Sequence, residues 1–531
     1  MHRLAVALTT LLTLVGVAVV VGYLFIFGPS PDRAAAMAPS TSVAFVSVYL
    51  SPSTGQEMSL ADLLTRLPGL EDRATLADKL DEIVQRSLGD AGIDYHANVK
   101  PWLGDQLAVA LVPAPAAPTS GVPAAPVVFA GVRDSAEAEA AIRRIAEANG
   151  GQLTTGSYAG VTTYSLGNQA AGGGRVAILD DMLVATAEES VLQRVIDTAQ
   201  GNAERLSDAT SFRGAMRDLP SDRLASAYVN VSSVAALGGA AGSTGYSAAG
   251  LAVVAHGDGL QVVGRAPYDA STADASSRAN HALATEPSGL TDWMPASTQG
   301  ELVIFGAQQV FETLASQLGA VPGGQDAAQS LTQLRALVAL GLGIDFDRDL
   351  LPLFDHESAI ALGDVGGGTP HGQLLLRPSD ADAAADTLSR LTEALRSRGS
   401  DVTRADADGV TVTSIAIPQI ARVAYAMKDG IIIVGLSVDD VAAALSAHAS
   451  GETLGASTGY RAAFDIAGGR GGNELYLDGA QGMNLILGLL GQSPDSLPTD
   501  VRDILSQIRA LAISVPAQQN SIEIHATVTV R

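Results

Sequence analysis

The sequence contains no cysteine and only three lysines, Lys79, Lys100 and Lys428. The absence of cysteine excludes disulfide bonds, thiolate nucleophiles and cysteine-ligated zinc or iron–sulfur sites. Acidic residues outnumber basic ones, so the formal net charge is −24 at pH 7. Because such a surface repels polyanions, the composition argues against nucleic acid as a partner, and against a body that lies flat on anionic lipid.

The N-terminus carries a long run that is both uncharged and predominantly apolar. Residues 4–27 contain no charge and follow Arg3. A helix of this length rises about 36 Å, and the hydrocarbon core of a bilayer is roughly 30 Å thick. The run therefore predicts an uncleaved signal anchor at 1–28, with a cytoplasmic N-terminus and, after a tether at 29–36, an extracytoplasmic body. The alternative is cleavage at the small residues 34–36, which would give a secreted protein.

The sequence repeats itself at a separation of roughly 250 residues, which is longer than any solenoid repeat and predicts two tandem homologous units. Similar segments occur in the same order in both halves, and their first residues pair as Met37 with Met294, Gly92 with Gly343, Pro101 with Pro352, Gly160 with Gly409, and Thr210 with Thr458. We therefore expect a first unit at 37–268, a linker at 269–293 and a second unit at 294–531. The linker is rich in serine, alanine and aspartate.

Periodicity and turn residues predict the fold class. Asp429-Gly430, between two apolar stretches, predicts a hairpin turn, and Asp408-Gly409 predicts another. In residues 522–530 apolar and polar side chains alternate, which is typical of an antiparallel strand with its apolar face buried and its polar face exposed. The prediction is an α+β protein: an N-terminal transmembrane helix, then two units that are each a mainly antiparallel sheet with packed helices.

Pairs of residues with capping-box spacing predict where several helices begin. In such a pair a side-chain oxygen accepts a hydrogen bond from a backbone N–H that the helix leaves free. The pairs are Asp134 with Glu137, Thr186 with Glu189, Ser379 with Asp382, and Ser437 with Asp440.

Residues 101–105, Pro-Trp-Leu-Gly-Asp, precede a strand rich in alanine and valine. In this motif and in the order of its segments, the chain resembles a bacterial family of membrane-anchored extracytoplasmic proteins that is filed as a domain of unknown function. The resemblance extends from residue 38 to the C-terminus and implies architecture and location alone. The second half departs from the motif, with Leu353 in place of Trp102 and Asp355 in place of Gly104. Trp102 and Trp293 are expected to anchor packing, with ligand binding as the alternative.

Two motifs suggest catalysis but lack residues that the chemistry needs. Residues 455–459 have the GxSxG spacing of a nucleophile elbow around Ser457, but no predicted strand precedes them and Ala209 replaces the serine in the first half. We therefore expect Ser457 in a helix-capping loop. His356-Glu357 begins like an HExxH zinc helix, but position 360 is isoleucine.

Other candidate ligand sites are incomplete in the same way. Asp345, Asp347 and Asp349 alternate as at the start of an EF-hand loop, but the loop's glycine and final glutamate are missing, so a solvated acidic turn is expected. The glycine runs at 172–174 and 366–368 lack the context of a phosphate-binding loop. The other histidines show no ligand spacing; they are His96, His256, His281, His371, His448 and His525, besides His2.

The sequence thus predicts no catalytic residue, no cofactor and no metal. We expect a non-enzymatic binding or scaffold module, held near the membrane by its N-terminal helix, whose partner is a protein or a small apolar ligand. One alternative is a carrier of lipid or of another apolar ligand, which requires an apolar cavity. The other is a hydrolase that uses carboxylates in an unfamiliar arrangement.

Overall fold

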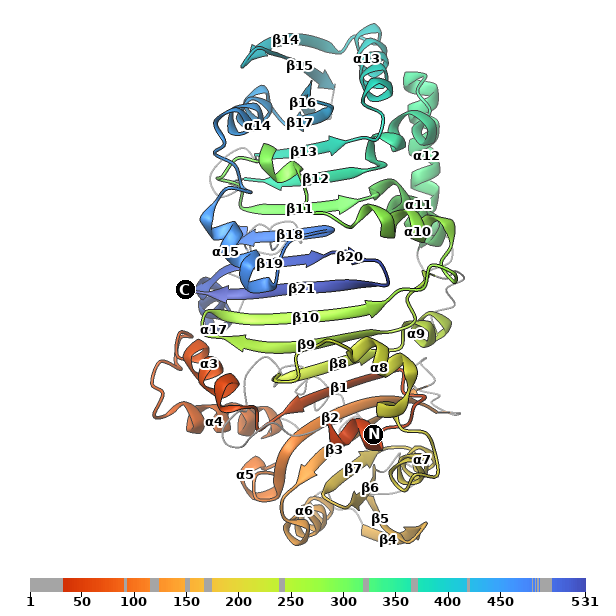
Figure 1. The fold of residues 1–531 in the computed structure, drawn as a ribbon, viewed down its shortest axis with the longest axis vertical. Coiled ribbons are helices and arrows are strands. Elements are labelled where there is room, and N and C mark those ends of the chain that lie inside the picture. Colours follow the sequence, from red (N-terminus) through yellow and green to blue (C-terminus); the bar gives the residue numbers. More distant parts are fainter. Residues whose placement is uncertain are drawn as a thin grey trace. The chain divides into compact units, whose positions relative to one another are not determined.

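The computed structural model describes residues 32–531, apart from 90–92, 115–123, 149–152, 167–173, 238–243, 319–323, 364–370, 418–420, 480, 483, 485–486 and 488–498. The chain divides into two compact units, unit 1 (Met1–Thr272) and unit 2 (Ala273–Arg531). Both are α+β with antiparallel strands, which confirms the α+β part of the predicted fold class (Figure 1). The predicted transmembrane helix lies outside the described residues, and none of the helices within them is both long and apolar enough to span a bilayer.

Unit 1 pairs its strands in the order β4-β5-β6-β7-β3-β2-β1-β8-β9-β10, with every neighbouring pair antiparallel. The strands are β1 (Ala44–Tyr49), β2 (Leu103–Pro113), β3 (Ala124–Val132), β4 (Leu153–Tyr158), β5 (Val161–Leu166), β6 (Gly174–Leu179), β7 (Met182–Thr186), β8 (Ala225–Val229), β9 (Ala249–His256) and β10 (Gly259–Pro267). The helices are α2 (Arg33–Met37), α3 (Thr54–Leu64), α4 (Leu76–Gly89), α5 (Tyr95–Asn98), α6 (Ser135–Ala148), α7 (Glu189–Ala199), η2 (Leu206–Asp208), α8 (Thr210–Met216) and α9 (Val231–Leu237).

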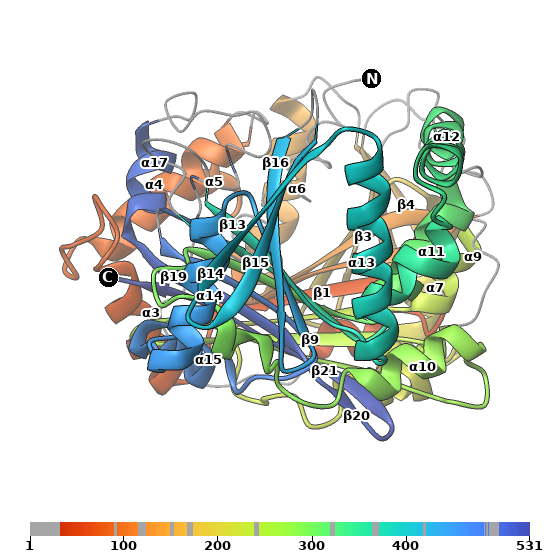
Figure 2. The same cartoon turned by 90° about the horizontal axis from the view of Figure 1, so that it is seen from above.

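Unit 2 pairs its strands in the order β14-β15-β16-β17-β13-β12-β11-β18-β19-β21, again antiparallel, and β20 pairs with β21 (Figure 1). The strands are β11 (Gly300–Phe305), β12 (Glu357–Leu362), β13 (Gly372–Arg377), β14 (Asp401–Ala407), β15 (Val410–Ile417), β16 (Ala421–Lys428), β17 (Ile431–Gly435), β18 (Asn473–Asp478), β19 (Ile508–Val515), β20 (Ala517–Gln518) and β21 (Ser521–Val530). The helices are α10 (Ala275–Leu283), η3 (Leu290–Trp293), α11 (Ala307–Leu318), α12 (Gly324–Leu342), η4 (Phe346–Leu350), η5 (Leu351–Phe354), α13 (Ala381–Ser397), α14 (Val438–Ser450), α15 (Thr458–Ala467) and α17 (Thr499–Gln507). Figure 2 shows α13 beside β14, which it contacts.

The central strands of unit 1 are buried on both faces. Because side chains alternate along a strand, Phe129 and Val184 face a core shared with α2, α7 and α8, whereas Val128 and Leu183 face a second core shared with α6. Helices therefore cover both faces of these strands.

The predicted orientation of residues 522–530 is wrong. Thr527 and Thr529 are buried, whereas Ile522 and Ile524 on the other face are only half-buried. The helix α15 packs against β19 and β21. Its Phe464 lies in one core with Ala512 of the neighbouring strand. A helix that lies close to a sheet requires small side chains beneath it. The buried face of β21 therefore carries small residues, and the more apolar residues lie on its other face.

Two segments predicted to be connectors are folded into the units. Residues 269–293 contain α10 and η3, and Leu290 and Trp293 belong to the core of unit 2. Residues 33–36 of the predicted tether lie in α2, with Ala34 and Ala35 buried in unit 1. Composition misled the prediction, because small and polar residues suit short amphipathic helices as well as linkers.

The predicted hairpin turns are confirmed. Asp429 and Gly430 have φ values of 51° and 77° between β16 and β17. Asp408 and Gly409, at 51° and 74°, connect β14 and β15 in the same way. Two successive residues with positive φ match the right-handed twist of the flanking strands, and aspartate and glycine tolerate that conformation.

Two of the four predicted helix caps are confirmed. The Asp134 carboxylate accepts from the Glu137 N–H at 3.0 Å, and the Ser437 hydroxyl oxygen accepts from the Asp440 N–H at 3.1 Å.

The other two predicted caps are wrong. Asp380 caps α13, because Ser379 is bonded to Asp355 instead. Thr186 ends β7, and the residue before α7, Glu188, makes no side-chain cap.

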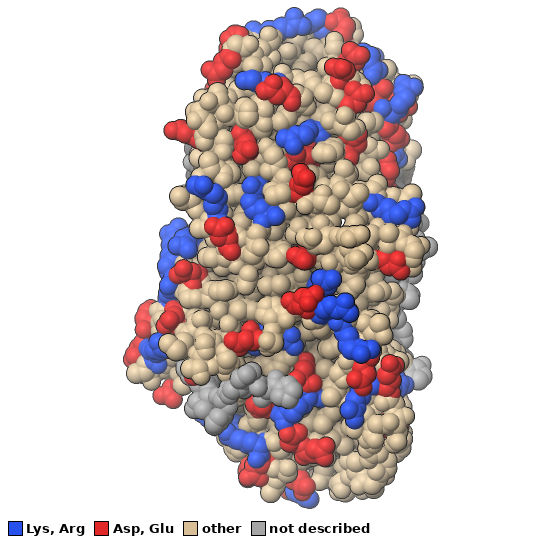
Figure 3. Space-filling model, in the orientation of Figure 1, with Lys and Arg blue, Asp and Glu red and all other residues tan. Residues whose placement is uncertain are grey.

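Charges on the face shown in Figure 3 are interspersed. Acidic and basic side chains occur side by side there, so the net negative charge of the chain is not concentrated in one acidic patch on this face.

Backbone packing in unit 2 predicts unequal costs for two glycine substitutions. Gly451 and Gly472 both have positive φ, but a Cβ at Gly451 would meet nothing within 4 Å, whereas one at Gly472 would lie 2.0 Å from the Val515 carbonyl oxygen. We expect Gly451→Ala to lower the free energy of unfolding by about 1 kcal/mol and Gly472→Ala by several times as much. Denaturant unfolding followed by Trp293 fluorescence, in a Trp102→Phe background, measures both; equal costs would contradict the packing described.

Candidate functional site: an apolar cavity in unit 1

A cavity of about 280 Å³ lies in unit 1 between the sheet and helices α4, α5 and α6. Its wall includes Val48, Leu107, Val128, Ala130, Val176, Leu183 and Ala185 from the strands, and Val84, Leu88, Ala138, Ala141 and Ile142 from the helices. Among the described residues that line it, only Tyr95 and Trp102 carry a polar side-chain atom. The Trp102 Nε1–H donates to the Asn98 carbonyl at 2.6 Å. The described part of the wall is therefore uncharged, and the Trp102 N–H is not free to bond a ligand because it already donates to Asn98.

Strand register and helix periodicity together build the wall. Val128 lies opposite Ala185 on paired β3 and β7, and Ala130 lies opposite Leu183, so all four point to the same face. From the other side, α6 presents residues 138, 141 and 142, which share one face of a helix. Alanine at four of these positions, 130, 138, 141 and 185, leaves space between the sheet and α6 that larger side chains would fill.

The motif at residues 101–105 shapes one end of the cavity. Trp102 is buried and forms part of the wall. A Cβ on Gly104 would lie 2.9 Å from the carbonyl carbon of Gly131, so glycine permits the close approach of β2 and β3. Asp105 forms an ion pair with Arg33 of α2, which also pairs with Asp181. Each of these residues thus has a structural role beside the cavity.

Equivalent positions in unit 2 carry larger side chains. The strands β13, β16 and β17 of unit 2 pair in the same way as β3, β6 and β7 of unit 1, so residues can be matched by their position in the register. The matched pairs are Val128 with Leu374, Ala130 with Leu376, Ala185 with Val434, and Val176 with Tyr425. The four residues of unit 2 pack in one cluster with Leu353, the counterpart of Trp102. The cavity of unit 1 therefore reflects its own small side chains and not the strand arrangement alone.

The sequence predicted the same packing role for both tryptophans, but their surroundings in the structure differ. Trp293 is buried in the core of unit 2 and stacks on His448, with ring centroids 3.6 Å apart and planes inclined by 6°. Trp102 lines the cavity. The sequence carried one signal of this difference, since the second half has leucine in place of Trp102.

The motifs with catalytic spacing have structural roles. Ser457 caps α15, as expected, and its hydroxyl oxygen accepts from the Tyr460 N–H at 3.3 Å. Glu357 begins a strand rather than a zinc-binding helix, and it is buried and pairs with Arg377 at 2.7 Å.

The acidic turn at 345–349 uses its carboxylates internally. Asp345 caps η4 by accepting from the N–H groups of Asp347 and Arg348. Asp349 accepts from the Asp345 N–H at 2.8 Å and pairs with Arg390, and these bonds, led by the backbone one, lower its pKa to about 2. No three acidic or histidine side chains in the described part of the chain are placed to share a metal ion. Of the two glycine runs, only Gly174, the first residue of β6, is described.

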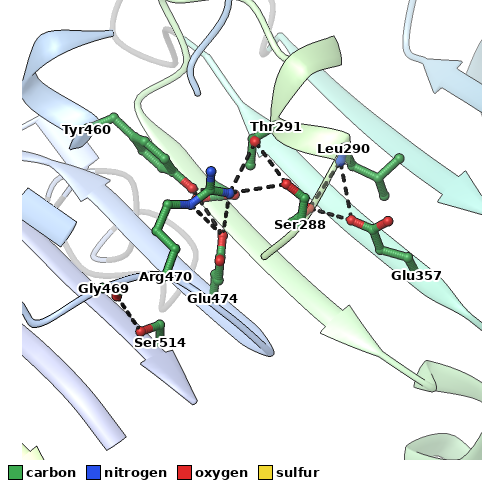
Figure 4. Close-up of polar contacts among 10 residues, drawn as sticks. Ser288, Leu290, Thr291, Glu357, Tyr460, Gly469, Arg470, Glu474 and Ser514 are labelled. Atoms are coloured by element: carbon green, nitrogen blue, oxygen red, sulfur yellow. Dashed lines mark hydrogen bonds and ion pairs between the residues drawn. The ribbon is translucent and has the colours of Figure 1, made fainter. Parts of the chain in front are cut away.

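Two carboxyl groups do converge in unit 2, and sequence reasoning did not identify them. The Tyr460 hydroxyl lies 3.2 Å from Glu301 Oε1 and 3.1 Å from Glu474 Oε2. Arg470 pairs with Glu474 at 2.8 Å and lies over the Tyr460 ring (Figure 4). Burial, and then the Glu474 charge, raise the pKa of Glu301 to about 8. Glu301 and Glu474 are 2% and 1% exposed, so a substrate has no access to them in this conformation.

A family model described as "protein of unknown function (DUF3352)" matches residues 4–531. The chain belongs to this family. The match confirms the part of the expected resemblance that concerns a domain of unknown function. None of the curated proteins matches this DUF3352 chain.

Solved structures add little. Crystal form III of TP0453 aligns with this DUF3352 chain at a TM-score of 0.23 and 11% identity, over 48% of this chain and 89% of its own. Crystal form I aligns at 0.23 and 10%, over 45% and 80%.

Buried charge in unit 2 predicts a large difference between two arginine substitutions. Glu474 is buried, so Arg470→Met would leave its carboxylate without a cation, whereas Arg396 pairs with Glu393 on an exposed helix face. We expect Arg470→Met to lower the free energy of unfolding by about 3 kcal/mol and Arg396→Met by less than about 0.5 kcal/mol. Denaturant unfolding reported by Trp293 measures both, and similar losses would show that the Glu474 carboxylate is not held by this pair.

Proposed function

We propose that this DUF3352 chain is a non-enzymatic, membrane-anchored extracytoplasmic protein whose first unit binds a small apolar ligand in the cavity beside Trp102. The cavity is the observation that carries the proposal, because the described residues of its wall are uncharged and it measures about 280 Å³. An engineered apolar cavity of about 150 Å³ stays dry and takes up benzene. A larger one with the same kind of wall favours a hydrocarbon chain or ring over a polar ligand.

The contrast between the units supports this reading. A well-packed interior holds few voids larger than a water molecule, and filling them normally stabilises a protein. Unit 2 has larger side chains at four register-equivalent positions, and its pocket of about 300 Å³ between α13 and the strands β14 and β16 has charged residues in its wall, Glu393, Arg396 and Arg404. Retention of small residues in unit 1 is therefore consistent with an interior that a ligand completes.

We further propose that the units are tandem homologues. Their strand pairing follows one order, and the matched segments of the sequence fall at corresponding elements, such as Thr210 and Thr458 at the first residues of α8 and α15. A sequence profile of unit 1 that failed to detect unit 2 would contradict this.

The membrane location is proposed from the uncharged residues 4–27. Asp32 and Arg33, which follow closely, bond to unit 1 through Tyr49, Gln106, Asp105 and Asp181. The body would thus begin within a few residues of the membrane. We expect protease added to spheroplasts to digest a tag placed after Arg531 and to spare a cytosolic control; a protected tag would place the body inside the cell.

Ligand binding is testable through the tryptophan in the cavity wall. In the Trp293→Phe variant of the full chain, Trp102 is the single tryptophan, and we expect a fatty acid brominated on its chain to quench its fluorescence saturably. In the Trp102→Phe variant, where Trp293 is the reporter, the same fatty acid should leave the emission unchanged. Absence of saturable quenching at Trp102, or equal quenching in both variants, would overturn the proposal.

Unit 2 supplies the matched substitutions for the same experiment. Ala130→Leu with Ala185→Val places the residues of unit 2 at the equivalent positions in unit 1 and should fill the cavity. We expect at least tenfold weaker binding with no loss of thermal stability, because the added carbons enter free space. Val234→Leu, at a site that is 46% exposed, is the control and should bind as the parent does.

A further inference from the structure

We propose that Glu301, Tyr460, Glu474 and Arg470 form a buried proton-binding site in unit 2, and that the bound proton holds β11, β18 and α15 together near neutral pH. This site is independent of the apolar cavity and of the function proposed for it. Glu301 lies on β11. Glu474 lies on β18 and Tyr460 on α15, and Arg470 follows that helix; these three side chains are labelled in Figure 4.

The first argument is a count of charges. Three carboxyl groups lie in this part of the core, those of Glu301, Glu357 and Glu474, and all are at most 2% exposed. Arg377 pairs with Glu357 at 2.7 Å, and Arg470 pairs with Glu474 at 2.8 Å. Glu301 forms no ion pair within the described residues, so ionisation would place an uncompensated charge in the core. The cost of such a charge exceeds that of keeping the proton.

The second argument is a count of hydrogens. The Tyr460 hydroxyl lies within hydrogen-bond distance of a carboxyl oxygen of both Glu301 and Glu474 but has one hydrogen to donate. If Glu301 is protonated, its O–H donates to the Tyr460 oxygen, and the Tyr460 O–H donates to the Glu474 carboxylate. Arg470 then donates to Glu474 and completes the chain of bonds. If Glu301 is ionised, two acceptors compete for one hydrogen.

The third argument comes from unit 1, where the same register positions are not acidic. Phe45 occupies the place of Glu301, with Tyr228 opposite it as Tyr476 is opposite Glu301. Ser226 occupies the place of Glu474, opposite Ser47. Phe45 packs edge-on against Phe212, with ring centroids 6.2 Å apart. The fold therefore does not require carboxyl groups here, and a buried ionisable cluster that the fold does not require is a candidate for a functional role.

The groups that face Glu301 set the direction of its titration. They are Glu474 and Tyr476 on β18, Tyr460 on α15, Arg470 after it, and Glu357 on β12 with its partner Arg377 on β13. Burial and the acidic neighbours raise the pKa of Glu301 to about 8 from an ordinary value of 4.5, and Arg470 lowers it less. Burial also raises the pKa of Tyr460, so its hydroxyl keeps the hydrogen that the chain of bonds needs.

The sign of the effect on stability follows from linkage. The folded state binds one more proton than the unfolded state between the ordinary pKa of 4.5 and the folded pKa of about 8. The stabilisation is therefore complete below this window, declines as pH rises through it and is lost above it. Within this window, each rise of one pH unit increases the equilibrium constant for local opening of this region by at most about tenfold.

Hydrogen exchange read by mass spectrometry tests the site on the full chain. After correction for the intrinsic exchange rate, amides of β11, β18 and α15 should lose protection with rising pH, by up to about tenfold per unit, and level off above about 8. In Glu301→Gln, which keeps the shape and a donor but cannot ionise, protection should be independent of pH. Glu393→Gln, at an exposed ion pair of the same unit, is the matched control and should behave as the parent.

Two further measurements separate a proton site from a merely structural cluster. The infrared carbonyl band of a protonated, buried carboxyl should be present at neutral pH and absent in Glu301→Gln. Glu301→Phe, which carries the residue of unit 1, should also remove the pH dependence if it folds. Protection that is flat with pH in the parent, an equal slope in Glu301→Gln, or no carbonyl band would overturn the proposal.

Discussion

The register of the antiparallel strands is the constraint on which the other features of the protein depend. Once two strands pair, every side chain is assigned to one face of the sheet and to fixed cross-strand neighbours. The volume and polarity of a few residues then decide what the interior contains. In unit 1, Ala130 and Ala185 share a face and a hollow lies above them. In unit 2, Leu376 and Val434 hold the same positions in a cluster of larger side chains.

The two units therefore represent two uses of one strand arrangement. On one face, unit 1 leaves apolar space where unit 2 has larger residues. On the other face, unit 1 packs Phe45 where unit 2 buries Glu301. The cavity costs unit 1 the packing energy of a filled interior, and the acidic cluster costs unit 2 the desolvation of its carboxyl groups. Neither feature is required by the fold, which is why both are candidates for function.

Residues 32–37, which lie close behind the predicted membrane helix in the sequence, belong to the body of unit 1. Asp32 accepts hydrogen bonds from Tyr49 and Gln106, and Arg33 pairs with Asp105 of the 101–105 motif. Burial raises the pKa of Asp32 despite these bonds. The motif thus joins two parts of unit 1: its tryptophan forms the cavity wall and its aspartate holds α2.

The sequence by itself determined the α+β class, the hairpin turns at Asp408 and Asp429 and the caps at Asp134 and Ser437, because each depends on the conformation of a few neighbouring residues. It did not determine which face of β21 is buried. That face packs against α15 and therefore carries small side chains, whereas the alternation of apolar and polar residues predicted that the more apolar face would be buried. The cavity and the Glu301–Glu474 pair were also beyond it. Each is built from residues that are far apart in the chain and meet only through strand register, so volume and charge could be compared across the site only in the tertiary structure.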